Sequence, residues 1–326
     1  MQRYVTQISG DRIQVTSQDT PVPFAGPQQL LVRVQAAGLN RGEILALRQS
    51  PADTPASLGI EAAGEIVAVG AGSGVFQAGQ RIMGRCKNAF ADYALLDARD
   101  AMPIPDALSW EQAAAIPITT MVVYDMLVVQ GRLTADEWLL IAGISSGVGV
   151  AALQLAKMLG ARVIGTSGSP DKLAALADHG LDLGIPTRSP DFHAAVMNAT
   201  GDRGADLAVN VVGGSVLAEC VHSLAFQGRL AIVGHVDGVR SGPLDLGALH
   251  GQRLQLFGVS SKGLNAAQRQ RIVQGVVNEV LPAIAGGRMS PLIDQVFPFD
   301  QLEAAIARME SNAQLGKIVV THHPAG

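Results

Sequence analysis

The chain contains little charge and few cysteines, and each shortage excludes classes of protein. Only 16% of its 326 residues are Asp, Glu, Lys or Arg, compared with roughly 25% in an ordinary soluble domain. The formal net charge is −4 and no run of five like charges occurs, so a nucleic-acid partner is not expected. The two cysteines, Cys86 and Cys220, lie far apart and predict no disulfide framework, which is typical of a reducing cytoplasm.

A secretory signal and a membrane span are also not expected. The segment from Met1 to Gly10 is mixed and polar, without the apolar region of a signal peptide. The uncharged stretch from Trp138 to Ala156 is as long as a membrane helix, but Gly143, Gly147 and Gly149 interrupt it. We therefore interpret it as a strand, a glycine turn and a helix, and we predict a cytoplasmic protein without a membrane partner.

In the first third of the chain, short strand patterns alternate with glycine turns. Strands are expected at residues 30–35, 65–69, 81–83 and 93–96. This spacing predicts a small barrel-like β domain. Near residue 109 the pattern changes, because Ser109 and Gln112 have the spacing of a helix-capping box.

From there onward, strand patterns alternate with helix patterns. Strands are expected at residues 138–143, 161–166, 205–212, 228–234 and 253–259, and helices at 148–159, 170–179 and 191–200. The alternation implies an α/β fold with a doubly wound parallel sheet and helices on both faces. After Asn265 the chain returns to mixed helix and strand, and a last strand is expected at 316–320.

Residues 139–152 have the pattern of a phosphate-binding turn. A buried strand leads into small residues, and an apolar helix follows, so the backbone and the helix N-terminus can approach a pyrophosphate. A literal G-x-G-x-x-A match begins at Gly147, four residues beyond the strand, whereas a register on Ile144, Ser146 and Gly149 fits the strand end better. The alternative is an ordinary turn whose small residues serve packing. The predicted cofactor-binding residues are Ser145, Ser146, Gly147, Val148 and Gly149.

The end of the next expected strand selects between the two nicotinamide cofactors. NAD-dependent enzymes usually place Asp or Glu about 20 residues after the turn. Here Ser167 to Ser169 contain no acid, and Lys172 follows one helical turn later. The Ser167 hydroxyl and the Lys172 ammonium suit the 2′-phosphate of NADPH, so NADPH is expected. The alternative is that Ser169 only caps a helix and that Lys172 is a solvated surface residue.

Short motifs recur in a specific order along nearly the whole chain. They occupy residues 37–41, 58–66, 79–81, 91–93, 145–157, 211–214 and 316–319. In this order they resemble the zinc-independent, quinone oxidoreductase-like branch of the medium-chain dehydrogenase/reductase superfamily. The resemblance implies a GroES-like catalytic domain of the β-barrel type, formed by residues 1–118 and 264–326, and a Rossmann domain formed by residues 119–263. It also implies an active site in the cleft between these domains.

The resemblance further predicts that the protein binds no zinc. Zinc-dependent relatives carry a ligand His at the position of Ile60 and a ligand Cys near Asn40, and their structural zinc needs four cysteines. Zinc sites take three or four ligands, mostly Cys and His, and this chain has two cysteines in all. We interpret most of the histidines as structural or surface residues and His322-His323 as an adventitious site at most. The histidines interpreted as structural are His179, His193, His222, His235 and His250.

Several residues gain candidate roles from the resemblance. Asn40 matches a family asparagine near the nicotinamide and is the candidate donor to a substrate or cofactor oxygen, with a turn-forming role as the alternative. Arg41 either orients an oxyanion or faces solvent. Tyr124 is interpreted as a packing residue. Arg188 lies beside Thr187, which stands where the family often has a tyrosine that binds the 2′-phosphate. The remaining predicted cofactor-binding residues are Val212, Gly213, Gly234 and Lys317.

The predicted function is NADPH-dependent hydride transfer to quinones or α,β-unsaturated carbonyl compounds without a metal. A simple carbonyl compound would lack its electrophilic activation if no metal is bound, whereas conjugated substrates are already activated. The strand at 254–259 is an apolar sheet edge and predicts a homodimer. The alternatives are a non-catalytic NADPH-binding or redox-sensing protein and a zinc-free alcohol dehydrogenase.

Overall fold

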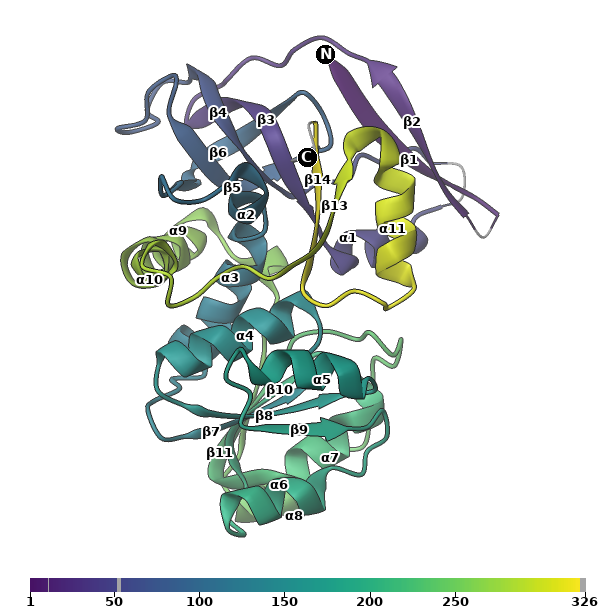
Figure 1. The fold of residues 1–326 in the computed structure, drawn as a ribbon, viewed down its shortest axis with the longest axis vertical. Coiled ribbons are helices and arrows are strands. Elements are labelled where there is room, and N and C mark those ends of the chain that lie inside the picture. The colour runs from purple at the N-terminus through teal and green to yellow at the C-terminus, as the bar shows by residue number, and fades with distance from the viewer. Residues whose placement is uncertain (11, 52–53, 323–326) are drawn as a thin grey trace. The chain divides into compact units, whose positions relative to one another are not determined.

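A computed structural model describes residues 1–10, 12–51 and 54–322 of the chain. The chain divides into two compact units (Figure 1). The first unit comprises Met1–Thr119, Asn265–Ala285 and Pro291–Gly326, and the second comprises Thr120–Leu264 and Gly286–Ser290. Helix α3 (Pro117–Tyr124) contains the boundary between them along the chain.

The first unit is a closed, mainly antiparallel β structure. Its strands are β1 (Gln2–Ser9), β2 (Arg12–Asp19), β3 (Gln29–Leu39), β4 (Glu61–Val69), β5 (Arg81–Lys87), β6 (Tyr93–Pro103), β13 (Ile293–Pro298) and β14 (Lys317–Thr321). Six of them form a sheet in the order β13-β14-β3-β4-β5-β6, and β3 also pairs with β6. This extra pairing closes the sheet and confirms the barrel-type domain.

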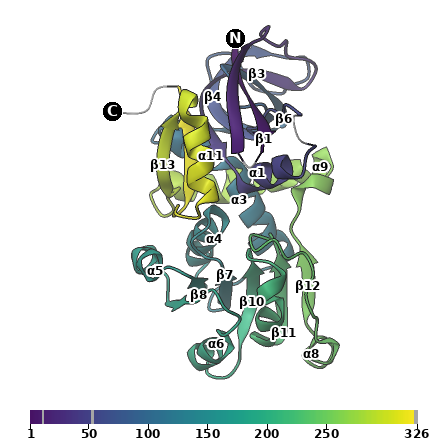
Figure 2. The same ribbon diagram turned by 90° about the vertical axis from the view of Figure 1, so that its right-hand side faces the viewer.

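Helices cover the ends of this β structure. They are α1 (Arg41–Arg48), α2 (Trp110–Ala114), α9 (Ala266–Gly275), the π-helical η4 (Val276–Val280), α10 (Leu281–Ala285), the 3₁₀ turn η5 (Phe299–Gln301) and α11 (Leu302–Glu310). Helix α11 packs beside β13 and β14 (Figure 2). The predicted capping box is confirmed at α2, where the Ser109 hydroxyl accepts a hydrogen bond from the Gln112 N–H.

The second unit is a parallel sheet covered by helices. Its strands are β7 (Trp138–Ala142), β8 (Arg162–Ser167), β9 (Leu183–Pro186), β10 (Ala205–Asn210), β11 (Leu224–Ile232) and β12 (Gln255–Gly258). The strand order is β12-β11-β10-β7-β8-β9, with every pairing parallel. The order reverses beside β7, which is the doubly wound arrangement expected from the alternating patterns.

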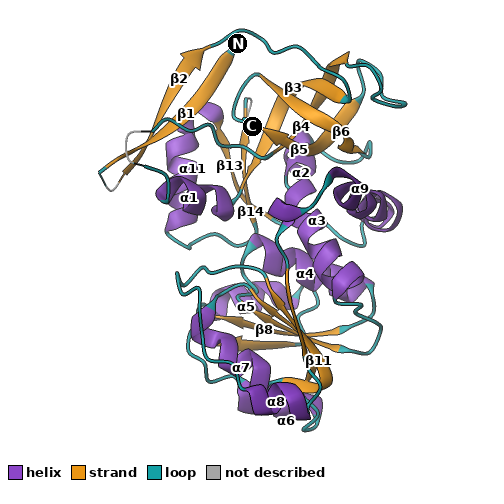
Figure 3. Cartoon of the chain, turned by 180° about the vertical axis from the view of Figure 1, so that it is seen from behind, coloured by secondary structure: helices purple, strands orange, loops and turns teal. Residues whose placement is uncertain are grey.

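Helices lie on both faces of this parallel sheet. They are η1 (Asp125–Gln130), α4 (Gly147–Met158), α5 (Pro170–Ala177), α6 (His193–Thr200), η2 (Gly214–Val216), α7 (Leu217–His222), α8 (Leu246–Gly251) and η3 (Ser261–Gly263). Figure 3 shows α4 on the face opposite α6 and α7. In the described parts of the chain, no helix is long and apolar enough to cross a membrane.

No strand was predicted from the sequence at the positions of four observed strands, β1, β2, β9 and β13. β1 and β2 pair antiparallel over their full lengths, from Gln2 with Asp19 to Ser9 with Arg12. Among the apolar side chains of this hairpin, only those of Val5 and Ile13 are buried, so the alternating pattern is weak. The backbone ladder and its neighbours determine this hairpin, and hydrophobic periodicity does not reveal it.

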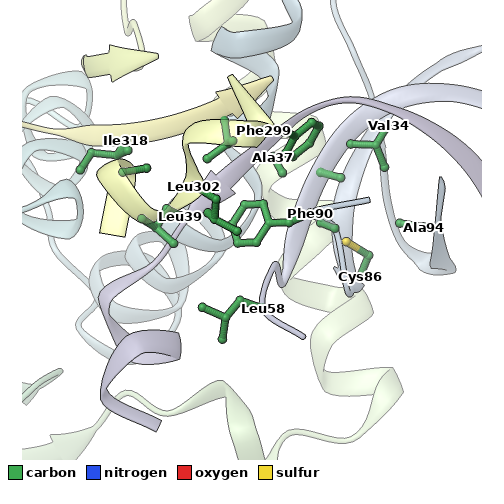
Figure 4. Packing of buried hydrophobic residues seen from close by; sticks show 14 of the residues in the cluster. Val34, Ala37, Leu39, Leu58, Cys86, Phe90, Ala94, Phe299, Leu302 and Ile318 are labelled. Carbon is green, nitrogen blue, oxygen red and sulfur yellow. The ribbon is translucent and has the colours of Figure 1, made fainter. Parts of the chain in front are cut away.

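The core of the first unit fixes the ends of two strands that matter for function (Figure 4). Phe90 and Phe299 meet edge to face at 6.2 Å between ring centroids. In the ladder between β3 and β14, Leu39 is the partner of Ile318, and both side chains are fully buried. The packing therefore holds Asn40, which follows Leu39, close to Lys317, which precedes Ile318.

Candidate functional site

The predicted phosphate-binding turn connects β7 to α4 in the second unit. Gly143 begins it with φ 87°, a conformation that favours glycine. Ser146 is the N-cap of α4, since its hydroxyl accepts from the Gly149 N–H and donates to the Gly143 carbonyl, both at 3.0 Å. The N–H groups of the first helical residues, Gly147 and Val148, have no acceptor within the helix. An N-terminus of this kind suits a phosphate oxygen.

Gly149 is required by packing. A Cβ atom at this position would overlap the carbonyl group of Ile144, and one at Gly165 would overlap the Ile144 side chain. This close approach of helix to strand is the role of the third glycine in dinucleotide-binding turns. The structure therefore supports the register on Ile144, Ser146 and Gly149.

Four predicted residues lie at or near the end of β8. The hydroxyl oxygens of Ser145 and Ser167 are 3.3 Å apart. The Arg188 side chain packs directly against Gly168. A Cβ atom at position 168 would overlap the Arg188 guanidinium and its aliphatic stem. Lys172 lies in the first turn of α5, and its N–H is capped by the Ser169 hydroxyl at 3.4 Å. The capping role of Ser169 is thus confirmed, and it is compatible with a phosphate contact from Lys172.

The remaining second-unit residues lie at the carboxyl ends of β10 and β11. Asn210 is buried and binds both the N–H and the carbonyl of Gly213, at 2.9 and 2.8 Å. Gly213 has φ 137°, and Val212 contacts Gly143. Gly234 follows β11 and lies against the Val211 carbonyl. Because β7, β8, β10 and β11 are parallel, all these residues lie along one edge of the sheet.

Lys317, the last predicted cofactor-binding residue, belongs to the first unit. It is buried at the start of β14. Its ammonium group lies 2.6 Å from Glu61 Oε1 and 2.6 Å from Asn40 Oδ1. The structure thus shows Lys317 as the partner of a buried carboxylate, and its cofactor contact stays a prediction.

Four side chains form what we call the buried carboxylate network: Asn40, Glu43, Glu61 and Lys317. Asn40 Nδ2 donates to Glu61 Oε1 at 2.8 Å and to Glu43 Oε1 at 3.1 Å. The second oxygen of Glu61 accepts from the Ile118 N–H at 2.8 Å. Glu43 is 7% exposed and Glu61 is 0% exposed, so both carboxylates depend on these partners.

The network contains a proton site that titrates near neutral pH. Burial raises the pKa of Glu43 to about 7, although hydrogen bonds from the Gly59 N–H and from Asn40 act in the opposite direction. Neighbouring Glu61 also raises this pKa, and Lys317 lowers it. A carboxyl group with such a pKa can hold or release a proton under physiological conditions.

Sequence reasoning missed Glu43 and Glu61. Each stands in a mainly apolar segment of a chain that has little charge, Glu43 before Ile44 and Glu61 before Ala62-Ala63. Acids in such positions are rarely buried unless they are paired. An acidic residue in an apolar segment could therefore have marked Glu43 and Glu61 as candidate buried, paired carboxylates. The sequence does not reveal which residues pair with them.

Arg41 lies at the start of α1 beside the network. Its guanidinium donates to the Met309 carbonyl, near the end of α11, at 2.5 Å, and burial lowers its pKa. At least one N–H group of Arg41 is therefore used in a structural hydrogen bond to α11. Asn40 is the N-cap residue of α1 without a capping hydrogen bond, because its amide is engaged in the network.

Comparison with known proteins matches both units. Residues 26–106 match the family described as alcohol dehydrogenase GroES-like domain, and residues 147–277 match the family described as zinc-binding dehydrogenase. The chain belongs to the medium-chain dehydrogenase/reductase superfamily. Its α/β architecture of a GroES-like domain and a parallel-sheet domain agrees with the resemblance found in the sequence.

Individual relatives are distant but extend over most of this chain. Highly-reducing polyketide synthase 1 of Aureobasidium melanogenum is 28% identical over 313 residues, which cover 93% of this chain and only 14% of the synthase. The synaptic vesicle membrane protein VAT-1 homolog of Mus musculus is 27% identical over 333 residues, covering 96% of this chain and 81% of that protein. The structure of Escherichia coli quinone oxidoreductase complexed with NADPH superimposes with a TM-score of 0.87 at 25% identity, covering 98% of this chain and all of that chain.

One matched family is named for zinc, so possible metal ligands require attention. From the resemblance, zinc-dependent relatives are expected to carry a ligand His at the position of Ile60 and a ligand Cys near Asn40. The two cysteines of this chain, Cys86 and Cys220, are buried free thiols. Within residues 1–10, 12–51 and 54–322, no group of three or more His, Cys, Asp or Glu could hold a metal ion. His323, part of the predicted adventitious pair, lies outside the described residues.

Proposed function

We propose that this protein is an NADPH-dependent reductase of quinones or α,β-unsaturated carbonyl compounds. The observation that carries the proposal is the composition of the sheet edge after β8, where Arg188 lies against Gly168, the residue after Ser167, and residues 166–169 contain no carboxylate. An acid there would bind the 2′-hydroxyl of NADH, whereas hydroxyls and a guanidinium suit the 2′-phosphate of NADPH.

The second unit fits this cofactor residue by residue. The turn from Ser145 to Gly149 would hold the pyrophosphate, since a side chain at Gly149 would overlap Ile144. Ser167, Lys172 and Arg188 would hold the 2′-phosphate. Val212, Gly213 and Gly234 would line the same edge. When bound, NADPH supplies a hydride from its nicotinamide ring, and the similar Escherichia coli quinone oxidoreductase is complexed with NADPH.

We propose that the first unit supplies the hydrogen-bond donor for the substrate oxygen. Reduction of a conjugated carbonyl places negative charge on oxygen, and a positioned donor stabilises that charge. Asn40 Nδ2 is the candidate, but its hydrogens are shared between Glu43 and Glu61. Protonated Glu43 is a weaker acceptor than its carboxylate, so protonation releases one Asn40 hydrogen for the substrate. Glu43 is therefore a positioning residue, and Arg41 is a second candidate donor.

Steady-state assays with matched panels test the proposed reaction. With NADPH as the hydride donor, quinones and enones are expected to be reduced faster than saturated aldehydes. With NADP⁺ as the hydride acceptor, secondary alcohols are expected to be poor substrates. If NADPH absorbance does not decay with any acceptor although NADPH binds, the non-catalytic alternative replaces the proposal. If alcohols are oxidised faster than any quinone or enone is reduced, the alcohol dehydrogenase alternative replaces it.

We also propose that the protein is a homodimer. Strand β12 is an edge of the parallel sheet, and Leu256 and Phe257 in it are only partly buried. Exposed apolar edges are usually covered or paired. Light scattering at micromolar concentration should give twice the chain mass, and the mass of a single chain would contradict the proposal.

A further inference from the structure

The first unit contains a cavity that the proposed function does not use. Its volume is about 750 Å³, within the roughly 300–1,000 Å³ typical of small-molecule sites. The lining comes from Met1 and β1, from the segment after β2, from the start of β3, from β5 and β6 with the loop between them, and from α9. We call it the basic cavity, because its lining includes Arg3, Arg85, Lys87 and Arg269.

The acids in the basic cavity are already paired. Asp97 accepts from Arg99 at 2.6 and 2.8 Å. Asp100 is buried and lies 3.0 Å from Arg269 and 3.8 Å from Arg85. These two carboxylates therefore leave positive charge in the lining uncompensated.

Two of the cations have no acidic partner. Among the described residues, neither Arg3 nor Lys87 lies within ion-pair distance of a carboxylate. Arg3 Nε and Thr20 Oγ1 are buried and have no hydrogen-bond partner there. A buried polar atom without a partner destabilises a protein, so a bound acceptor would stabilise this site.

Part of the remaining lining is apolar and suits a carbon skeleton, while Gln29 and Asn88 add polar groups. Pro21, Pro23, Leu95 and the ring of Tyr93 contribute to the same cavity. Guanidinium groups bind carboxylates and phosphates through paired hydrogen bonds. A ligand that neutralises both unpaired cations needs at least two negative charges.

We propose that the basic cavity binds a small organic anion with at least two carboxylate or phosphate groups, which accept hydrogen bonds from Arg3 and Lys87. The site lies wholly within the first unit, and its residues are separate from the buried carboxylate network and from the second-unit turn. The proposal is therefore independent of the proposed reductase activity.

Calorimetric titration with citrate and with fructose 1,6-bisphosphate tests the proposal. Wild-type protein should bind at least one probe saturably with one site per chain, and the tighter probe identifies the preferred oxyanion. The variant R3Q/K87Q should bind that probe about tenfold or more weakly, the range for losing charge-assisted hydrogen bonds. The variant R12Q is the matched control, since Arg12 is an exposed cation of the same hairpin outside the cavity, and its affinity should stay within about twofold of wild type.

Each titration is repeated with saturating NADPH, because anions can also bind a helix N-terminus. Binding in the basic cavity should persist in its presence. The proposal is overturned if neither probe binds saturably, if R12Q weakens binding as much as R3Q/K87Q, or if NADPH abolishes binding. Thermal unfolding of each variant identifies folding defects, and the single variant K87Q, which changes an exposed side chain, decides the outcome if R3Q/K87Q is unstable.

Discussion

The two units bring together functional groups in opposite ways. In the second unit, the candidate site consists largely of backbone at consecutive residues, where Gly143, Ser146 and Gly149 shape one turn. In the first unit, the buried carboxylate network consists of side chains that α1, β4 and β14 supply. A site made of local backbone tolerates little added volume, whereas a site made of buried charges tolerates little change in charge.

The largest effect is expected from removing the cation of the network. Lys317→Met leaves Glu61, which is 0% exposed, without its ammonium partner, and breaking a buried pair costs about 3–5 kcal/mol of unfolding free energy. Urea denaturation measures this loss. Adding Glu61→Gln should recover part of it. Lys157→Met is the control, since its pair with Asp182 is exposed at 31% and 33% and should contribute about 0–1 kcal/mol. If both Lys variants lose the same unfolding free energy, the buried pair of Lys317 and Glu61 stabilises the protein no more than an exposed ion pair does.

The second effect concerns turnover. Asn40→Ala removes the candidate donor and should lower kcat by roughly ten- to a thousandfold, the range for losing a positioned donor. Stopped-flow measurement of NADPH oxidation with the best quinone or enone checks it. Asn198→Ala, at an exposed position in α6, should leave kcat unchanged. A variant at residue 40 with wild-type kcat would remove Asn40 from the mechanism.

The third effect tests the backbone side of the comparison. Gly149→Ala forces a Cβ into the Ile144 carbonyl, so the turn has to shift, and restoring the overpacked geometry costs about 1–3 kcal/mol. NADPH is expected to bind only the unshifted turn, so this cost opposes binding. The dissociation constant for NADPH should therefore rise roughly five- to a hundredfold, as fluorescence titration can measure. Gly251→Ala in α8 meets no atom within 4 Å and should leave NADPH affinity unchanged. Unchanged affinity in both variants would argue against this turn as the pyrophosphate site.

The fourth effect is a pH dependence of stability. Glu43 has a pKa of about 7 when folded and about 4.3 when unfolded, so the native state binds the proton more tightly. Stability from this group is therefore complete below about pH 4.3 and is lost as pH rises through about 7, by roughly 2–3 kcal/mol between pH 5 and pH 8. The difference in unfolding free energy between wild type and Glu43→Gln isolates this contribution. A difference that does not vary with pH would show that Glu43 has an ordinary pKa.

The smallest effect concerns cofactor selectivity. NADPH should bind roughly tenfold or more tightly than NADH, because a charge-assisted contact contributes about 1.5–3 kcal/mol. Lys172→Ala should weaken NADPH binding and leave NADH nearly unchanged. Equal losses for both cofactors would show that Lys172 serves the fold of α5 instead of the phosphate.

The sequence by itself determined the features that depend on neighbouring residues. The alternating strands and helices of the second unit, the capping box at Ser109, and the register of the turn on Ser146 and Gly149 all follow local rules of periodicity, capping and steric size. The structure bears out the alternation and the capping box, while the use of the Ser146 and Gly149 register by a cofactor stays a prediction. The absence of an acid after β8, which favours NADPH, is also a local feature.

Tertiary structure alone decided which distant side chains meet. Asn40 and Lys317 are neighbours because β14 pairs with β3, and Glu61 joins them from β4 in the same sheet. The β1–β2 hairpin, whose strand β1 contributes Arg3 to the basic cavity, has no clear hydrophobic alternation. Strand register and burial set these contacts, and burial, which depends on the whole packed unit, raises the pKa of Glu43. A linear pattern records residue types at fixed spacing, whereas desolvation and long-range pairing exist only after the chain has folded.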